Sequence, residues 1–258
     1  MNQVIRHELH ARVGAVAEVI DLAPRMRRVV IELAAGSPPV PWVRLAVGDH
    51  VKLAFPDASG RLNLPAQPGV RPAPGEPRPV LRDYTVRAVP DAAHAVFDFV
   101  LHGDGPASTW ASNATVGSPL GVLGPRGSRV MPGDRPRYLC LIDSTALPAA
   151  ARWMEEAPAD AVVEVAVEGP AETIAALPTR ANGSLTRVEG TDGSGLVAYL
   201  TGHRPHPGDL VWAAGETSSM IAVRRAAAAL GVSREDLDVH GYWKQGVANR
   251  DHHAPLED

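Results

Sequence analysis

The rhythm of the sequence changes about halfway along the 258-residue chain, and this change constrains the fold most. Before Pro132, short β-branched or alternating runs such as Phe97-Asp98-Phe99-Val100 are separated by Gly, Pro and Asp. Several short strands at such a spacing favour a closed or nearly closed antiparallel barrel. We predict these strands over residues 11–19, 26–33, 50–55, 84–89 and 95–101, with a long Pro/Gly-rich loop over 56–79.

After Pro132, strand-like runs alternate with helical ones, which predicts a parallel sheet with helical crossovers. The predicted strands cover residues 137–143, 162–167, 210–214 and 239–243, and the predicted helices cover 145–156 and 218–230. Gly231 is a suitable residue to end the second helix. The sequence therefore predicts two domains, an antiparallel β-barrel over 1–132 and an α/β domain over 133–245, followed by a polar tail over 246–258.

Charge and cysteine content exclude several classes of function. A net charge of −4 argues against a nucleic-acid surface, because binding to backbone phosphates needs a basic excess. The single cysteine, Cys140, allows no internal disulfide framework and no cysteine-ligated iron–sulfur cluster. No apolar run approaches the roughly 20 residues of a spanning helix, and the N-terminus lacks the apolar core of a signal peptide. We expect a cytoplasmic protein without membrane insertion.

The segment Arg82-Asp83-Tyr84-Thr85 combines a guanidinium, an aromatic ring and a hydroxyl. On an extended strand, Arg82 and Tyr84 point to one face and Asp83 and Thr85 to the other. A guanidinium binds a phosphate bidentately, a ring stacks on a flat heterocycle, and a hydroxyl binds a ring edge. These groups suit a ligand that is flat at one end and phosphorylated elsewhere, although a strand also carries Tyr and Thr for packing alone.

A Gly- and Pro-bearing turn, residues 102–110, follows about twenty residues later. Turns of this composition present backbone N–H groups to an anion. Together the two segments favour a flavin dinucleotide, FAD, and Tyr84 and Thr85 are the candidate catalytic residues. The candidate FAD-binding residues are Arg82, Asp83, Tyr84, Thr85, Val100, His102, Gly105, Pro106, Ala107, Ser108 and Trp110.

Two strand-to-helix junctions in the second half are candidate NAD(P)H-binding positions. Ligands of doubly wound sheets lie at the carboxyl ends of the strands, and a helix N-terminus favours a negative group. The candidates are Asp143, Ser144, Thr145, Ala146, Gly215 and Glu216. The first junction carries no GxGxxG fingerprint, and Asp143 or Ser144 could there be merely an N-cap. At the second junction, Glu216 could merely complement the helix dipole.

Three further features have a local and a functional interpretation. The stretch from Gly121 to Gly127 reads as a hairpin turn, or as a segment that brings Arg126 to a flavin or an anionic substrate. Trp243 and Lys244 stand together near the C-terminus, where they indicate the edge of a site. The pairs His203/His206 and His252/His253 have no carboxylate or cysteine nearby in sequence, so we assign no metal.

These segments together resemble the siderophore-interacting protein family, FAD-containing ferric-siderophore reductases of the ferredoxin-reductase superfamily. The resemblance covers residues 82–87, 101–111, 124–127, 145–148, 212–216 and 241–243, in family order. It implies a flavin-binding β-barrel, an NAD(P)H-binding α/β domain, and electron transfer from NAD(P)H through the flavin to a ferric siderophore. It also implies that basic residues at the flavin mouth bind the anionic chelate. Here these are Lys52, Arg126 and Lys244, with Trp243 beside them.

Two departures from the family pattern concern the electron donor. Ser144 stands where family members commonly have an acidic residue, and residues 184–187 lack a tryptophan often found there. A ferredoxin is therefore an alternative donor to NADH or NADPH. Two other functions stay open, a general NAD(P)H:flavin electron-transfer reductase and a non-catalytic flavin- or siderophore-binding protein.

Overall fold

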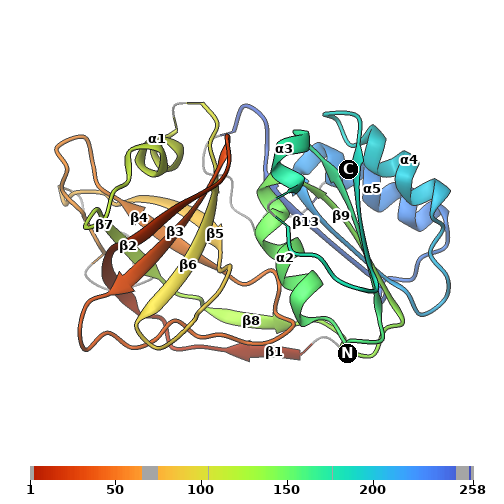
Figure 1. Ribbon diagram of the computed structural model, residues 1–258, viewed down its shortest axis with the longest axis horizontal. Coiled ribbons are helices and arrows are strands. Elements are labelled where there is room, and N and C mark those ends of the chain that lie inside the picture. The colour runs from red at the N-terminus through yellow and green to blue at the C-terminus, as the bar shows by residue number, and fades with distance from the viewer. Residues whose placement is uncertain (1–2, 66–74, 104, 176, 248–255, 257–258) are drawn as a thin grey trace. The chain divides into compact units, whose positions relative to one another are not determined.

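The structure is a computed structural model that describes residues 3–65, 75–103, 105–175, 177–247 and 256. The chain divides into two compact units between Met131 and Pro132, and each unit has its own hydrophobic core (Figure 1). The predicted tail over 246–258, including His252 and His253, lies almost wholly outside the described residues, as does part of the predicted 56–79 loop. No described helix is long and apolar enough to cross a membrane.

The first unit is built on a six-stranded antiparallel sheet in the order β5-β4-β7-β2-β3-β6. Its strands are β2 (Ala11–Ala23), β3 (Met26–Leu33), β4 (His50–Phe55), β5 (Val80–Thr85), β6 (His94–Val100) and β7 (Pro119–Leu123). Ala88, just after β5, bridges Val96 of β6 and so joins the two edges of the sheet. A separate pair is formed by β1 (Gln3–Arg6) and β8 (Gly127–Val130), and α1 (Pro106–Asn113) follows β6. The predicted antiparallel sheet is confirmed.

The core of the first unit follows from the alternation of its strands. Side chains of one strand point alternately to the two faces, so each strand lends every second residue to the interior. Phe97 and Phe99 show this pattern on β6, and both are fully buried. They pack with Val29 and Ile31 of β3 and with Phe55 of β4.

The second unit contains a five-stranded parallel sheet in the order β11-β10-β9-β12-β13. Its strands are β9 (Arg137–Asp143), β10 (Val162–Glu168), β11 (Gly183–Val188), β12 (Leu210–Glu216) and β13 (Leu237–Trp243). A 3-10 turn, η1 (Ser144–Ala146), leads into α2 (Leu147–Glu156), and the other helices are α3 (Ala171–Ile174), α4 (Ser194–Gly202) and α5 (Thr217–Ala229). The predicted α/β unit with a parallel sheet is confirmed.

Helices cover both faces of this parallel sheet. Trp153 of α2 packs against Tyr138 of β9 and Trp212 of β12 on one face. The alternate residues Leu139 and Val211 belong to the cluster that buries α4 and α5. Figure 1 shows α2 on one side of this sheet and α4 and α5 on the other. Chain order reverses between β9 and β12, and ligands of such sheets bind at the carboxyl ends of the strands on either side of this point.

Three predicted elements differ from the structure. The strand predicted over 84–89 is β5, Val80–Thr85, so the Arg82–Thr85 segment lies inside a strand rather than at its start. The turn predicted over 102–110 becomes a helix at Pro106, because proline fits the first helical position, where no N–H is needed. The local interpretation of residues 121–127 as a hairpin turn, which stood beside a functional one, does not hold, because β7 pairs with β2 and β4, whereas β8 pairs with β1.

Candidate functional site

Four aromatic rings bring the two predicted flavin-binding segments together in the first unit. Tyr84 of β5 lies 4.5 Å from Phe99 of β6, measured between ring centroids. Phe99 in turn lies 5.6 Å from Trp110 of α1, and Phe55 of β4 lies 5.5 Å from Trp110. Burial raises the pKa of Tyr84, so its phenol stays neutral and can donate a hydrogen bond. Sequence reasoning missed Phe55 and Phe99 as members of this cluster, because both look like ordinary core residues of alternating strands.

Arg82 and Asp83 have different environments although they are neighbours. The Arg82 guanidinium donates to the carbonyl of Leu81 at 2.7 Å and makes no other hydrogen bond to the described residues. The Asp83 carboxylate, on the opposite face of β5, accepts from Lys52 Nζ of β4 at 2.8 and 3.0 Å. These residues oppose each other in the β4–β5 register. Arg82 is therefore available for a ligand, whereas Lys52, predicted for the substrate, shares its charge with Asp83.

The loop before α1 is held in place by a predicted FAD-binding residue. The backbone N–H of His102 donates to Ser108 Oγ at 2.9 Å, which ties the start of the loop to the first turn of the helix. Ser108 and Ala107 are buried, whereas His102 and Gly105 are exposed. Gly105 is the N-cap residue of α1, and no side chain of the described residues caps this helix. An uncapped first turn directs its N–H groups toward other acceptors, of which a phosphate is a favourable one.

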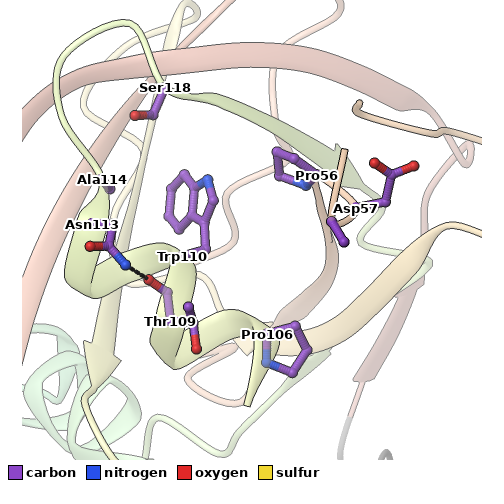
Figure 2. Close-up of a pocket in the computed structure, with 9 residues that line it drawn as sticks. Pro56, Asp57, Pro106, Thr109, Trp110, Asn113, Ala114 and Ser118 are labelled. Atoms are coloured by element: carbon purple, nitrogen blue, oxygen red, sulfur yellow. Dashed lines mark hydrogen bonds between the residues drawn. The ribbon is translucent and has the colours of Figure 1, made fainter. Parts of the chain in front are cut away.

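A pocket of about 470 Å³ lies beside α1 (Figure 2). The helix supplies Pro106, Thr109, Trp110 and Asn113 to its lining, and Pro56, Asp57 and Ala58 after β4, with Ala114 and Ser118 before β7, complete it. Asp57 accepts hydrogen bonds from Ser59, Arg61 and Asn63, which hold its pKa at about 2 and stiffen the loop after β4.

The donor set of the first unit fits FAD. A phosphorylated, flat ligand needs a cation, an uncapped helix start and an aromatic surface, and Arg82, α1 and the Tyr84–Trp110 cluster supply these. The other predicted FAD residues lie nearby in the fold: Thr85 is buried at the end of β5, and Val100 ends β6, from which the loop to α1 departs.

A single carboxylate, Asp143, organises the predicted donor site of the second unit. Its Oδ1 accepts from the backbone N–H and hydroxyl of Thr145 at 2.8 and 2.5 Å. Its Oδ2 accepts from the backbone N–H of Glu216 at 2.8 Å and from the Trp243 indole at 2.7 Å. Burial raises the pKa of Asp143, and these hydrogen bonds oppose the shift. Asp143 thus joins the carboxyl ends of β9, β12 and β13.

The remaining predicted donor residues surround Asp143. A Cβ at Gly215 would lie 2.7 Å from Asp143 Cγ, so only glycine permits this close approach. The Glu216 carboxylate caps α5, accepting from the backbone N–H of Ser219 at 3.0 Å and also from that of Ser218. Ser144 is half-buried beside Gly169, and Ala146 is buried. Asp143 is thus an N-cap, whereas Glu216 does more than complement the helix dipole, because it caps α5. Both lie at the carboxyl ends of strands, where a ligand would bind.

The predicted substrate residues are divided between the two units. In the first, Arg126 is exposed in the turn between β7 and β8, and its guanidinium makes no hydrogen bond to the described residues. In the second, Lys244 is exposed just after β13. Trp243 is 41% exposed and hydrogen-bonded to Asp143, so the structure places it beside the predicted donor residues.

Sequence reasoning missed Glu168, the last residue of β10. Its Oε2 accepts from the backbone N–H of Gly193 at 3.0 Å, whereas its buried Oε1 has no hydrogen-bond partner among the described residues. Glu168 pairs in register with Asp143, at the same carboxyl edge of the sheet. The signal that could have found it is an acidic residue at the end of the second parallel strand, because this position often contacts the ribose of a dinucleotide.

Comparison with known proteins gives a consistent result for both units. Residues 15–129 match the family model described as the siderophore-interacting FAD-binding domain, and residues 135–246 match that of the siderophore-interacting protein. The crystal structure of a siderophore utilization protein from T. fusca is 36% identical, with a TM-score of 0.87, and the match covers 98% of this chain and 100% of that one.

Two curated relatives match over shorter stretches. The ferric vibriobactin reductase ViuB of Vibrio cholerae is 38% identical over 117 residues, which are 44% of this chain and 43% of that protein. The NADPH-dependent ferric-chelate reductase of Escherichia coli is 33% identical over 155 residues, 59% of each chain. The matched stretches thus span about half the length of these relatives.

Proposed function

This chain belongs to the siderophore-interacting protein family, and on that premise we propose that it is an FAD-dependent reductase of ferric siderophores in the cytoplasm. The observation that carries the proposal is the aromatic cluster on which Tyr84 of β5 and Trp110 of α1 converge, with Arg82 two residues before Tyr84 on the same strand, inside a unit that matches an FAD-binding domain. The names of the two curated reductases support a ferric chelate as the substrate, and one of the two names supports NADPH as the donor.

The first unit would hold the flavin through groups that have few internal partners. Arg82 would bind a phosphate through its free guanidinium N–H groups, and the first turn of α1 would bind another. Tyr84 and Thr85 would lie along the ring system, where Tyr84, neutral because of its raised pKa, donates a hydrogen bond. Bound FAD would supply the chemistry, accepting an electron pair from a nicotinamide and passing single electrons to Fe³⁺.

The second unit would orient the electron donor at the carboxyl ends of β9 and β12. Asp143 holds the two strand ends together and presents the Ser144–Ala146 turn, which precedes α2, to a phosphate. If this turn did not bind a nicotinamide nucleotide, a ferredoxin would be the electron donor instead.

Basic residues would bind the ferric chelate. Arg126 and Lys244 are exposed, and Lys52 offers the part of its charge that Asp83 does not neutralise. Because most ferric catecholate complexes are anionic, a few cations on a chain of net charge −4 would steer and hold them. Reduction to Fe²⁺ weakens binding by the hard oxygen ligands of the siderophore and releases the metal.

A paired anaerobic assay tests this function. The FAD-loaded protein is mixed with NADH or NADPH, and the flavin absorbance is followed; a ferric siderophore and a ferrous-iron trap are then added. We expect the flavin absorbance band to bleach when the donor is added. It should recover after the ferric siderophore is added, while the ferrous-iron trap develops its colour.

Three other outcomes have distinct meanings. Bleaching without ferrous iron would indicate a general flavin reductase. Reduction by ferredoxin alone would reassign the donor. No turnover even after reduction with dithionite would refute a ferric reductase and favour a binding protein.

A further inference from the structure

The turn between β7 and β8 exposes Arg126 while its backbone is closely confined. Gly124 and Pro125 are buried, whereas the next residue, Arg126, is exposed. A Cβ at Gly127, the first residue of β8, would lie 2.8 Å from the carbonyl oxygen of Ile5 in β1. That distance is too short for a side chain, so β1 approaches the turn as closely as glycine allows. Arg126 is thus the side chain that this confined turn offers to a ligand.

The segment between β1 and β2 holds the backbone of the turn on both sides of Arg126. The backbone N–H of Gly124 donates to the carbonyl of His10 at 3.0 Å, and that of His7 donates to the carbonyl of Arg126 itself at 3.0 Å. Arg12 of β2 adds a buried hydrogen bond from its guanidinium to the Gly124 carbonyl at 2.7 Å. The position of the Arg126 main chain is therefore set by this segment and by β2.

The His7 side chain extends this attachment to the loop before β4. Its Nε2 lies 2.7 Å from Ser128 Oγ, and the Ser128 hydroxyl donates to Asp49 Oδ2 at 2.5 Å. Because that hydroxyl gives its own proton to Asp49, it accepts from His7, whose Nε2 therefore carries a proton. Burial lowers the pKa of His7, so the ring is uncharged at neutral pH and Nε2–H is its donor. Ser128 is fully buried and Asp49 is 5% exposed, so losing a donor from this chain of hydrogen bonds is costly.

The chain of hydrogen bonds connects the two basic residues of the first unit that are predicted to bind the chelate. Asp49 comes directly before β4, the strand that carries Lys52, and Ser128 follows Arg126 by two residues. In the β4–β7 register Lys52 opposes Leu123, the last residue of β7, which stands three residues before Arg126. Lys52 and Arg126 therefore belong to neighbouring parts of the fold, near the start of β4 and just after the end of β7.

We propose that His7 is a positioning residue for the ferric chelate: through Ser128 and Asp49 it fixes Arg126 relative to Lys52, so that both cations bind one anionic chelate. The inference rests on the proposed function only in taking an anionic ferric chelate as the ligand. Cations that are held in place before binding lose little conformational entropy when the chelate arrives, which strengthens binding. Without the donor of His7, the Arg126 turn and the start of β4 would be held together less tightly.

Equilibrium binding to the oxidised, FAD-loaded full chain tests the proposal without turnover. The probe is a hexadentate ferric tris-catecholate, an anionic complex, and equilibrium dialysis gives its Kd. We expect His7→Leu, which removes the N–H donor but keeps an apolar side chain, to raise the Kd about fivefold, the order of one exposed ion pair. His7→Gln, whose amide N–H can replace Nε2–H, should restore the Kd to within about twofold of wild type.

A double-mutant cycle shows whether His7 acts through Arg126. Arg126→Ala should weaken binding at least as much as His7→Leu does, and adding His7→Leu to Arg126→Ala should raise the Kd no further. The control is His94→Leu, which removes a half-buried histidine of the same unit that pairs with Asp91. His94 belongs to no predicted site, so this variant should bind the probe as wild type does.

Ser128→Ala breaks the same chain of hydrogen bonds at its middle and should raise the Kd as His7→Leu does. The proposal would be overturned if both variants kept their FAD and the wild-type Kd, or if His7→Leu weakened binding equally with and without Arg126. It would also be overturned if the wild-type chain did not bind the probe, or if both variants lost FAD or folded structure, which would assign these hydrogen bonds to stability alone. The expected Kd values without release of ferrous iron in the paired assay would contradict the proposed function and support this inference.

Discussion

Arg82 is the residue at which FAD binding is most directly tested. We expect Arg82→Ala to lower FAD affinity by about tenfold or more, because a hydrogen bond to a charged group contributes roughly 1.5–3 kcal/mol. The guanidinium has one internal hydrogen bond, to Leu81, so its removal should perturb folding little. The measurement is the FAD content of the purified protein after gel filtration, with Arg6→Ala on β1 as an exposed control. Equal flavin content in the two variants would remove Arg82 from the site.

Lys52 shows, also at the scale of single residues, that the role predicted for a side chain depends on the side chains beside it. Its sequence position suggested a free cation for an anionic chelate, whereas the structure pairs it with Asp83 across two strands. Side-chain exposures of 44% for Lys52 and 20% for Asp83 leave the pair within reach of solvent, so the attraction is modest. Replacing Lys52 alone would also remove its ion pair with the Asp83 carboxylate.

At the scale of elements, Arg12 of β2 fastens two backbone segments of the first unit. It is almost fully buried and donates to the carbonyls of Pro38, Pro39 and Gly124 at 2.6, 2.8 and 2.7 Å. Burial lowers the pKa of this guanidinium. The loop before β4 and the turn after β7 thus depend on one side chain from β2.

We expect Arg12→Met to lower the free energy of unfolding by roughly 2–4 kcal/mol, because buried carbonyls lose their donor. Urea unfolding of the FAD-loaded protein measures this loss. Arg25→Met, at an exposed position between β2 and β3, should change stability by less than about 0.5 kcal/mol. A similar small effect at Arg12 would contradict its assigned role.

Glu168 of β10 accepts a hydrogen bond from the backbone at the start of α4. Its raised pKa predicts that the free energy of unfolding depends on pH. Because burial raises the pKa of Glu168 above its usual 4.5, the folded chain keeps a proton that the unfolded chain releases just above pH 4.5. The stability from this proton is fully present below pH 4.5 and is lost as the pH rises through the raised pKa. Glutamine does not titrate, so the stability of Glu168→Gln relative to wild type should rise with pH and then level off.

Unfolding by urea between pH 4.5 and 8 measures this difference, with Glu235→Gln, at an exposed position just before β13, as the control. A difference that did not change with pH, or that fell as the pH rose, would show that the folded environment does not raise the pKa of Glu168.

At the scale of the whole molecule, a chain of net charge −4 must attract an anionic chelate through local cations. We expect Lys52→Ala/Arg126→Ala to keep its FAD but to reduce an anionic ferric siderophore at least tenfold more slowly. The difference in rate between wild type and this variant should shrink at high salt, because salt screens the attraction between the two cations of wild type and the chelate. Initial rates with a ferrous-iron trap measure it.

The control for this variant removes the same charge elsewhere. Arg204→Ala/Arg234→Ala changes two exposed positions of the second unit that belong to no predicted site. Equal rates for the two double variants would show that Lys52 and Arg126 do not bind the chelate.

The sequence by itself determined the order of the two sheets along the chain and the kind of ligand that the first unit suits. The change from alternating runs to strand–helix alternation predicted an antiparallel sheet followed by a parallel one, because side-chain periodicity is a local property of strands and helices. Arg82, Tyr84 and the 102–110 segment likewise indicated a flat, phosphorylated ligand by their side-chain chemistry alone. The helix that begins at Pro106 was missed because the glycines and the proline at its start are also typical of turns.

Only the tertiary structure decided which of these residues meet. Lys52 faces Asp83 through the β4–β5 register, and Asp143 binds the indole of Trp243, 100 residues further along the chain. The hydrogen bond that Glu168 accepts from the backbone N–H of Gly193 depends on where the loop before α4 returns to β10. These contacts arise from strand order and from the paths of crossovers, so they are set by long-range packing of the whole unit. Local sequence patterns carry no information about such packing, which is why the partners of Lys52, Asp143 and Glu168 could not be predicted.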